Sequence, residues 1–373
     1  MSGRPISALT KRVGPDGRGL LLDTGFRAVL GVGLYAIAPY LSDVHRLWRR
    51  DAGLVPGGFG PGQFEYPPLS ALYWGPISAL PNSVTAVIVN GVVMVAVAVL
   101  ITYLLLIWGG PERNVRIWAR SLVLLFFLPI GWDGLVALMI LIAVHQMVLN
   151  REYSAGVWAG AGAALKVVPG VLFLPVLPLL RDWASRLRFV VSGTVVVAIS
   201  YVLYALARPE SWLLHIDFAS VRDDTGNTLV GWLGIGLSPE QMGYASTALL
   251  GCSLVALTYW AWRSHPPIAD VALLAVAAFL LANKVHKPQY VLWLIPLLAL
   301  VGCSSRWVRI MEVAAVAELA TIYIEMPDYL SVVAGAVRVV AIVVLVVLVI
   351  SGVHRQDRNG GRPAIDTSVP QTT

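Results

Sequence analysis

Apolar segments of membrane-spanning length recur along almost the whole chain, and this pattern constrains the fold more than any other feature. Hydrophobic residues make up 57% of the 373 residues, and charged residues only 13%. A helix needs roughly 20 consecutive apolar residues to cross a bilayer, and soluble domains rarely repeat such runs. The sequence therefore predicts an all-α, polytopic membrane protein with about 10 to 12 transmembrane or re-entrant helices.

Twelve segments are candidates for these helices. Several are shorter than roughly 20 residues, so the pairs around Trp132-Asp133 and around Pro169 are expected to be half-helices or re-entrant hairpins. The candidates are 20–41, 82–108, 117–130, 135–149, 155–168, 170–180, 189–207, 243–262, 268–282, 290–303, 310–324 and 330–353.

Charge placement predicts the orientation and the domain limits. Residues 1–19 form a basic leader without a small-residue cleavage site, so we expect it to stay in the cytoplasm. Residues 20–353 then form a single multi-helix membrane domain, and the polar tail 354–373 is expected to be disordered and cytoplasmic. Most Lys and Arg residues fall in the inner loops under this assignment, as the positive-inside rule requires. The net charge of +6 therefore reflects topology and does not indicate nucleic-acid binding.

The same topology places the polar loops 42–81, 208–242 and 283–289 together on the outer face. The first of them carries Asp43, Asp51 and Glu65 just after the first apolar helix. We therefore expect the chemistry at the outer surface. The two cysteines, Cys252 and Cys303, lie inside apolar runs and indicate neither a disulfide nor a metal site.

Seven short elements occur in a particular order along the chain, and each alone is weak. They are Asp43 after the first helix, Phe64 to Leu69 (F-x-Y-P-P-L), Pro76 and Pro81, Trp132-Asp133, the small-residue stretch Gly156 to Pro169, Arg222 to Asp224, and Lys284 to Tyr290. Jointly they resemble the polyprenyl-phosphate-sugar-dependent glycosyltransferases of the C superfamily. The resemblance is to family 87, whose nearest characterised members are actinobacterial α-1,2-mannosyltransferases, and it covers most of the chain.

This resemblance implies an inverting hexosyltransferase of the plasma membrane that acts in cell-envelope glycolipid synthesis. The expected donor is a polyprenyl-phosphate-linked sugar, most readily mannose, and the expected acceptor is a glycolipid or polysaccharide; membrane lipids are its other contacts. No cofactor and no metal are expected. Asp43 matches the family's catalytic base by position. The alternative is that Asp43 only caps the following helix, since Asp is a favoured N-cap residue.

The expected donor-phosphate residues are cationic or potentially cationic. Arg46 can bind phosphate through its guanidinium fork, although it could also extend to lipid headgroups. Lys166 lies within an apolar segment and should face a cavity, pair with Asp133 or extend to the interface. Lys284 and His286 precede Pro288 in a cationic loop; the alternative for His286 is a solvated loop residue.

The sugar or acceptor is expected to contact a second set of residues. A residue before proline adopts extended geometry, so Tyr66 belongs to a rigid turn and is favoured as structural, with sugar stacking as the alternative. Arg222-Asp223-Asp224 is similar to metal-binding acidic pairs, but a loop salt bridge or acceptor recognition is favoured. The full set is Glu65, Tyr66, Asp133, Arg222, Asp223 and Gln289.

Two other functions remain open from the sequence. The protein could use another polyprenyl-phosphate hexose or a pentose such as arabinose. It could instead be a transporter or flippase of lipid-linked sugars. A transporter should carry functional charges near the membrane midplane and show internal repeats, whereas here the charges gather at one face and no repeat is evident.

Overall fold

The computed structural model is helical throughout the residues that it describes, which are 14–51, 66–108, 112–209, 212–221, 227–233, 236–303, 306–323 and 327–352. No strand occurs in these ranges, so the all-α prediction is confirmed. The long helices are α2 (Pro15–Ile37), α5 (Ser83–Ile107), α10 (Trp183–Ala207), α13 (Pro239–Ser264), α16 (Arg306–Tyr323) and α17 (Asp328–Ile350). The medium ones are α8 (Asp133–Val148), α9 (Glu152–Leu165) and α14 (Ile268–Ala282).

Short helices and 3-10 turns connect these elements. The helices are α3 (Asp43–Asp51), α4 (Pro68–Ser78), α6 (Glu112–Ala119), α7 (Val123–Phe126), α11 (Leu214–Val221), α12 (Leu229–Leu233) and α15 (Ile295–Val301). The turns are η1 (Pro39–Leu41), η2 (Leu128–Ile130), η3 (Val168–Leu172), η4 (Leu177–Leu179) and η5 (Pro288–Trp293). The expected outer loops 42–81 and 208–242 thus contain helices of their own.

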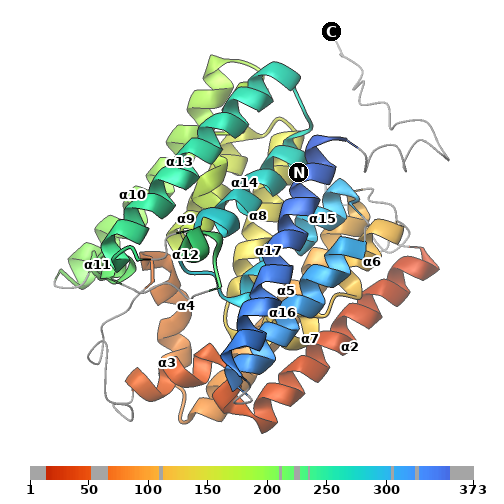
Figure 1. Ribbon diagram of the computed structural model, residues 1–373, viewed down its shortest axis with the longest axis vertical. Coiled ribbons are helices and arrows are strands. Elements are labelled where there is room, and N and C mark those ends of the chain that lie inside the picture. The colour runs from red at the N-terminus through yellow and green to blue at the C-terminus, as the bar shows by residue number, and fades with distance from the viewer. Residues whose placement is uncertain are drawn as a thin grey trace, which may run out of the picture.

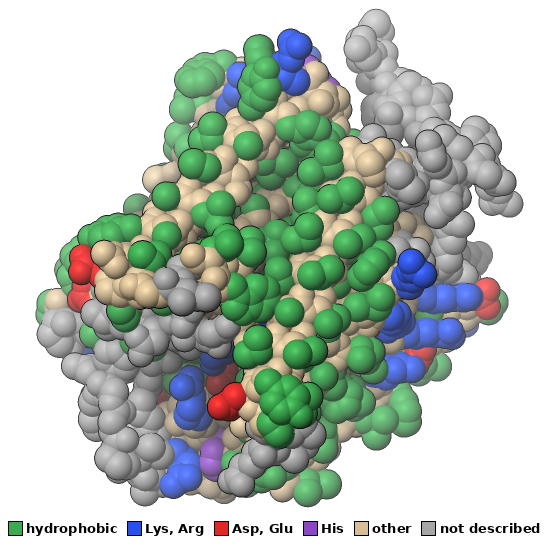
Figure 2. All heavy atoms as spheres, in the orientation of Figure 1, with side chains coloured by type: hydrophobic (Ala, Val, Ile, Leu, Met, Phe, Trp, Pro, Cys, Tyr) green, Lys and Arg blue, Asp and Glu red, His purple; other side chains and the backbone are tan. Residues whose placement is uncertain are grey.

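Five helices in the described part of the chain are long and apolar enough to cross a membrane: α2, α5, α10, α13 and α17. The shorter apolar segments Asp133–Val148, Ile268–Ala282 and Pro288–Val301 accompany them. Figure 2 shows apolar side chains spread over the middle of one face, while Lys and Arg side chains gather nearer its edges. An exposed apolar surface of this extent is what lipid contact requires. The chain is a polytopic membrane protein.

Two segments expected to be single helices are broken. The segment 117–130 divides into the end of α6, then α7 and η2, while 170–180 forms only the 3-10 turns η3 and η4. Proline explains the second case, because Pro169, Pro175 and Pro178 recur within ten residues and none has an amide hydrogen to donate. The segment 170–180 therefore cannot sustain an α-helical hydrogen-bond ladder.

Small residues bring α9 and α10 into close contact. A Cβ atom added at Gly160 would lie 2.4 Å from the carbonyl oxygen of Gly193, and one at Gly156 would lie 2.2 Å from that of Phe189. The glycines therefore allow backbone-to-backbone contact between the two helices. The small-residue stretch before Pro169 thus packs α9 directly against α10.

The ends of several helices lie at one end of the bundle, where α3 and α4 are seen at the lower left of Figure 1. There α2 gives way to η1 and α3, and α8 begins at Asp133. In the same region α9 ends just before Lys166, and α14 is followed by residues 283–287 and η5. Breaks in regular helix leave polar backbone and side chains near one another. Such breaks at membrane depth are tolerated where they line a cavity.

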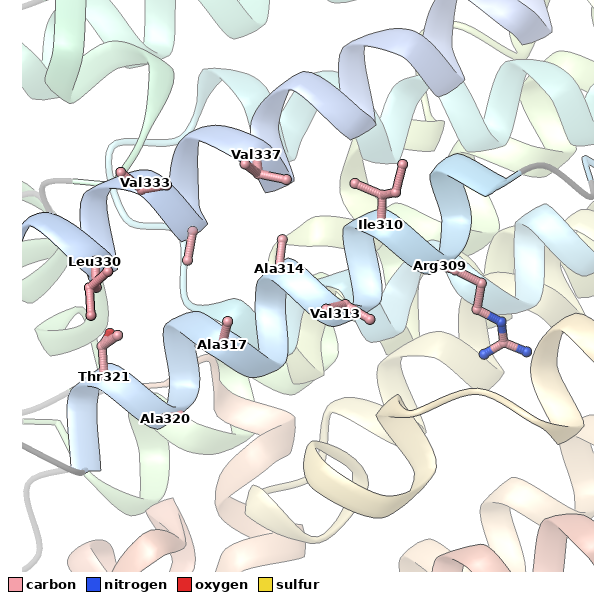
Figure 3. Close-up of a pocket in the computed structure, with 11 residues that line it drawn as sticks. Arg309, Ile310, Val313, Ala314, Ala317, Ala320, Thr321, Leu330, Val333 and Val337 are labelled. Carbon is pink, nitrogen blue, oxygen red and sulfur yellow. The ribbon is translucent and has the colours of Figure 1, made fainter. Parts of the chain in front are cut away.

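An apolar groove of about 570 Å³ lies between α16 and α17. Figure 3 shows small side chains of α16 and valines of α17 along it, with Arg309 at one end and Thr321 and Leu330 at the other. Its lining contains none of the predicted site residues.

Candidate active site

Asp43 is the first residue of α3, directly after the turn that follows α2. The hydroxyl of the preceding Ser42 accepts a hydrogen bond from the Val44 amide at 3.1 Å and so makes the N-terminal capping contact. The Asp43 carboxylate instead accepts from side chains far along the chain. Lys287 Nζ and Gln289 Nε2 lie 3.0 and 3.1 Å from its Oδ2 atom. This geometry argues against Asp43 acting only as a cap.

A second carboxylate, that of Asp133 at the start of α8, lies in the same cluster. Lys166 Nζ is 2.5 Å from Asp133 Oδ1, and Trp293 Nε1 donates to the same oxygen at 3.0 Å. Gln289 Nε2 lies 3.4 Å from the other oxygen, Oδ2. The expected pairing of Lys166 with Asp133 is therefore present in the structure.

The cluster consists of two carboxylate–lysine pairs bridged by one amide. Its members come from α3, α8, the residue after α9, and the 287–293 segment. The side chains of Lys166 and Asp133 are 14% and 5% exposed, against 20% and 15% for Lys287 and Asp43. Buried charges are tolerated when paired. Because the Asp43 pair is the more open one, Asp43 is the carboxylate that a substrate reaches more readily.

The surrounding charges determine the protonation of Asp43. Burial alone would raise its pKa, but the charges of Lys287 and Arg46, together with the hydrogen bonds from Lys287 and Gln289, hold the pKa below its usual range. The Arg46 guanidinium lies 3.6 Å from Asp43 Oδ1, and its side chain is 56% exposed. Asp43 is therefore ionised at neutral pH and is able to accept a proton.

An aromatic surface adjoins Lys166. Its Nζ atom lies 4.6 Å from the ring centre of Tyr290 and 4.9 Å from that of Trp293, and these two rings stack with centres 4.3 Å apart. A cavity of about 180 Å³ opens here, lined also by Tyr66 and Lys284. Two ammonium groups beside flat apolar rings suit a phosphorylated sugar, since cations attract phosphate and ring faces accept apolar sugar faces.

Tyr66 and Lys284 lie at the edges of this cavity, which we call the lysine cavity. The Tyr66 ring meets the Trp132 ring edge-on, with centres 4.9 Å apart. Lys284 is buried, and its Nζ donates to the Pro239 carbonyl at 3.2 Å. It also borders a larger cavity of about 1000 Å³ between α13 and α14. The contact of Lys284 with the donor phosphate and that of Tyr66 with the sugar or acceptor remain predictions.

His286 is placed differently from a solvated loop residue. It is 1% exposed, and its ring lies parallel to Tyr290 with centres 6.1 Å apart. Burial and the nearby charge of Arg338 lower its pKa well below the usual value, against the opposing hydrogen bond with the Leu280 backbone. A neutral imidazole could contact phosphate only as a hydrogen-bond donor. Its predicted role in phosphate binding remains untested.

Three predicted residues, Glu65, Arg222 and Asp223, lie outside the described residues. Within the described ranges, no group of three or more His, Cys, Asp or Glu side chains is placed to hold a metal ion. Of the eight predicted residues that the structure describes, five come together in the cluster: Asp43, Arg46, Asp133, Lys166 and Gln289. Tyr66, Lys284 and His286 lie outside these contacts.

Residues 64–283, more than half of the chain, match the profile of glycosyltransferase family 87. The chain belongs to glycosyltransferase family 87. The matched range contains Tyr66, Asp133 and Lys166 of the site, whereas Asp43 and the 287–293 segment lie outside it. Their assignment to the family 87 site therefore depends on the contacts described above.

The chain is also similar to a protein with an assigned function. The chain is 25% identical over 264 residues to a polyprenol-phosphate-mannose-dependent alpha-(1-2)-phosphatidylinositol mannoside mannosyltransferase of Mycobacterium tuberculosis. The alignment covers 64% of this chain and 62% of that relative's length. No solved structure matches the chain significantly.

The predicted site did not include Lys287, Trp293 or Tyr290, which contact its members in this family 87 chain. Lys287 belongs to the cationic loop after α14, so its charge was a signal that could have included it in the predicted site. The sequence does not indicate which lysine of this loop pairs with Asp43. Tyr290 and Trp293 are three residues apart, a spacing that places side chains on one face of a helical turn. That spacing could have indicated an aromatic surface.

Proposed function

We propose that this protein transfers a sugar, with mannose the first candidate, from a polyprenyl-phosphate donor to a hydroxyl group of a glycolipid or glycan on the outer face of the membrane. The observation that carries the proposal is the pair of carboxylate–lysine contacts joined through Gln289. Family membership and the printed function of the mycobacterial relative support the donor class.

The proposed step is a direct displacement with inversion. Asp43 accepts the proton of the acceptor hydroxyl as its oxygen forms a bond to the anomeric carbon. The bond from that carbon to the phosphate oxygen breaks on the opposite face, and its electron pair leaves with the polyprenyl phosphate. Lys166 and Lys284, which line the lysine cavity, stabilise the charge of the departing phosphate. Gln289 holds Asp43 in place relative to Asp133.

A transfer assay with purified protein tests this proposal. We expect incorporation of label from one member of a panel of polyprenyl-phosphate sugars, without any added cofactor. Asp43→Asn should lower turnover by roughly 100-fold to 10,000-fold, because the amide keeps the shape but cannot accept the proton. Asp182→Asn is the matched control, since Asp182 caps α10 through the Ser185 amide at 2.7 Å and Asn caps equally well.

Normal turnover of Asp43→Asn would remove Asp43 from the mechanism. Lack of incorporation with every donor would contradict the transferase proposal as a whole. One observation keeps a lipid-linked sugar flippase as the second candidate: Arg338 lies near the middle of α17 and is fully buried in an ion pair with Glu318 at 2.7 Å. A flippase would move labelled lipid across vesicle membranes without forming a new glycosidic bond.

A further inference from the structure

A second, separate cavity lies on the other side of the segment that carries Gln289. Residues 283–285, Tyr290 and Trp293 border the lysine cavity, whereas residues 286–289 border a cavity of about 220 Å³. The two linings share no residue among those described. The 283–293 segment therefore forms a partition, and the Gln289 amide on it contacts both carboxylates.

Asp43 lies in the second cavity, which we call the Asp43 cavity. Its other polar lining residues are Asn227, Lys287, Glu318, Tyr323 and Ser331, together with His286 and Gln289. Leu319 and Ile322 supply apolar contact. The volume equals that of about seven water molecules, which is the scale of a single sugar ring.

The polar atoms of this cavity are held in place by bonds within the protein. Asn227 Nδ2 donates to Glu318 Oε1 at 3.1 Å and to Ser331 Oγ at 2.8 Å. The buried Arg338 pairs with Glu318 at 2.7 Å and donates to the Asn227 carbonyl oxygen at 3.0 Å. A preorganised set of amide, hydroxyl and carboxylate groups loses little entropy when it binds a ligand.

The two cavities are lined by different charged groups. The lysine cavity has two lysines and no carboxylate among its described lining residues. The Asp43 cavity is lined by two carboxylates, each of them in an ion pair: Asp43 with Lys287, and Glu318 with Arg338. A phosphate would meet like charges in the second cavity, which is unfavourable, whereas sugar hydroxyls can both donate to carboxylates and accept from amides.

We propose that the Asp43 cavity binds the sugar ring of the acceptor, with Asn227, Glu318 and Ser331 as hydroxyl contacts, while the donor occupies the lysine cavity across the 283–293 partition. This inference depends on the proposed transferase function and deepens it. It explains why Asp43 faces away from the lysine cavity: its proton comes from the acceptor. The reacting atoms would then meet beside Gln289.

Kinetics provide the first test, with octyl α-mannoside as the acceptor probe and the protein in lipid nanodiscs, so that no sugar detergent fills the cavity. Ile322→Trp should raise the acceptor KM by about tenfold, the loss of one good contact, and leave the donor KM unchanged. Val313→Trp is the matched control, because Val313 is 57% exposed on the same helix and Ile322 is 58% exposed. Val313 lines the apolar groove of Figure 3 instead.

A binding test does not require turnover. In a Cys252→Ser background, Ser331→Cys places a thiol in the Asp43 cavity. Ser246→Cys places one in the larger cavity, which adjoins the lysine cavity through the shared lining residues Val167, Ala219 and Lys284. Octyl α-mannoside should slow thiol modification severalfold at position 331 only, and dodecyl phosphate should slow it at position 246 only. If the thiol at position 331 does not react without ligand, the Ile322→Trp kinetics decide.

The outcomes separate the two proposals. Protection at position 331 without any sugar transfer would contradict the transferase function but keep the sugar site. Transfer activity combined with octyl mannoside protection at position 246, or with none, would overturn the acceptor assignment. A raised donor KM in Ile322→Trp would also overturn it, because the donor would then occupy this cavity.

Discussion

At the scale of single residues, the central contact is the ion pair between Asp43 and Lys287. A carboxylate paired with ammonium is ionised but weakly basic, because the cation stabilises the charged form. The more exposed Arg46 adds to this effect. Lys287 therefore favours the ionised form of Asp43 in the absence of substrate.

The Asp43–Lys287 pair gives a pH-dependent prediction. Lys287→Met removes a charge that lowers the pKa of Asp43, so that pKa should rise by about 1–3 units. The acid limb of the kcat/KM profile should move to higher pH by the same amount, since Asp43 must be ionised to accept a proton. Arg46, Gln289 and Tyr323 also face Asp43 and stay unchanged.

Lys284→Met is the control for this profile, because its ammonium contacts the Pro239 carbonyl oxygen. It should leave the acid limb in place. The sign also applies to stability: the ion pair contributes above the ordinary pKa of an aspartate, and this contribution is lost as the pH falls through the lowered pKa. An acid limb that does not move in Lys287→Met would show that Asp43 is not the titrating base.

At the scale of elements, close helix packing at glycines and helix breaks at prolines together position the side chains of the site. The α9–α10 contact through Gly156, Gly160 and Gly193 fixes the end of α9, and Lys166 follows directly. The turn that starts at Pro288 prevents α14 and α15 from forming one continuous helix. The rigid helix pair positions one lysine, while the irregular segment positions Lys287 and Gln289.

The glycine contact leads to a stability prediction. Gly160→Ala would place a methyl group 2.4 Å from the Gly193 carbonyl oxygen, so the helices must separate. We expect a loss of about 1–3 kcal/mol, measured as a lower thermal unfolding midpoint in detergent. Gly251→Ala in α13 meets nothing within 4 Å and should be neutral or stabilising, since Ala favours helix. Equal midpoints for both variants would contradict this packing.

At the scale of the whole molecule, the site lies at one end of the bundle. Helix α8 starts at Asp133 in the site and ends at Val148, and its 16 residues span about 24 Å. Asn150 follows it and is exposed at the opposite end of this helix. Because the proposed outward orientation assigns these ends to different compartments, it can be tested directly.

Two cysteine positions test the orientation in intact cells, again in a Cys252→Ser background. Tyr40→Cys, at a position that is 64% exposed three residues before Asp43, should react with a membrane-impermeant thiol reagent. Asn150→Cys should react only after permeabilisation. The native Cys303 is buried and serves as the unreactive background. The reverse labelling pattern would place the site on the cytoplasmic face.

The sequence alone determined the class of fold and much of the list of site residues. Repeated apolar runs can be satisfied only by membrane helices, since backbone groups must bond internally in lipid. Charged residues in such a chain need a reason, which directed attention to Asp43, Asp133, Lys166 and the cationic loop. Proline spacing could also have indicated that 170–180 is not an α-helix, because this effect is local.

Only the tertiary structure decided which of these charges meet. Lys287 lies 244 residues from Asp43, and Trp293 lies 160 residues from Asp133. No local pattern encodes such partners, because several helices and their crossings must pack before the side chains approach. The buried pair of Glu318 and Arg338 and the partition between the two cavities depend on that packing in the same way. The sequence therefore determined which chemistry is present, and the packing of the helices decided how it is arranged in space.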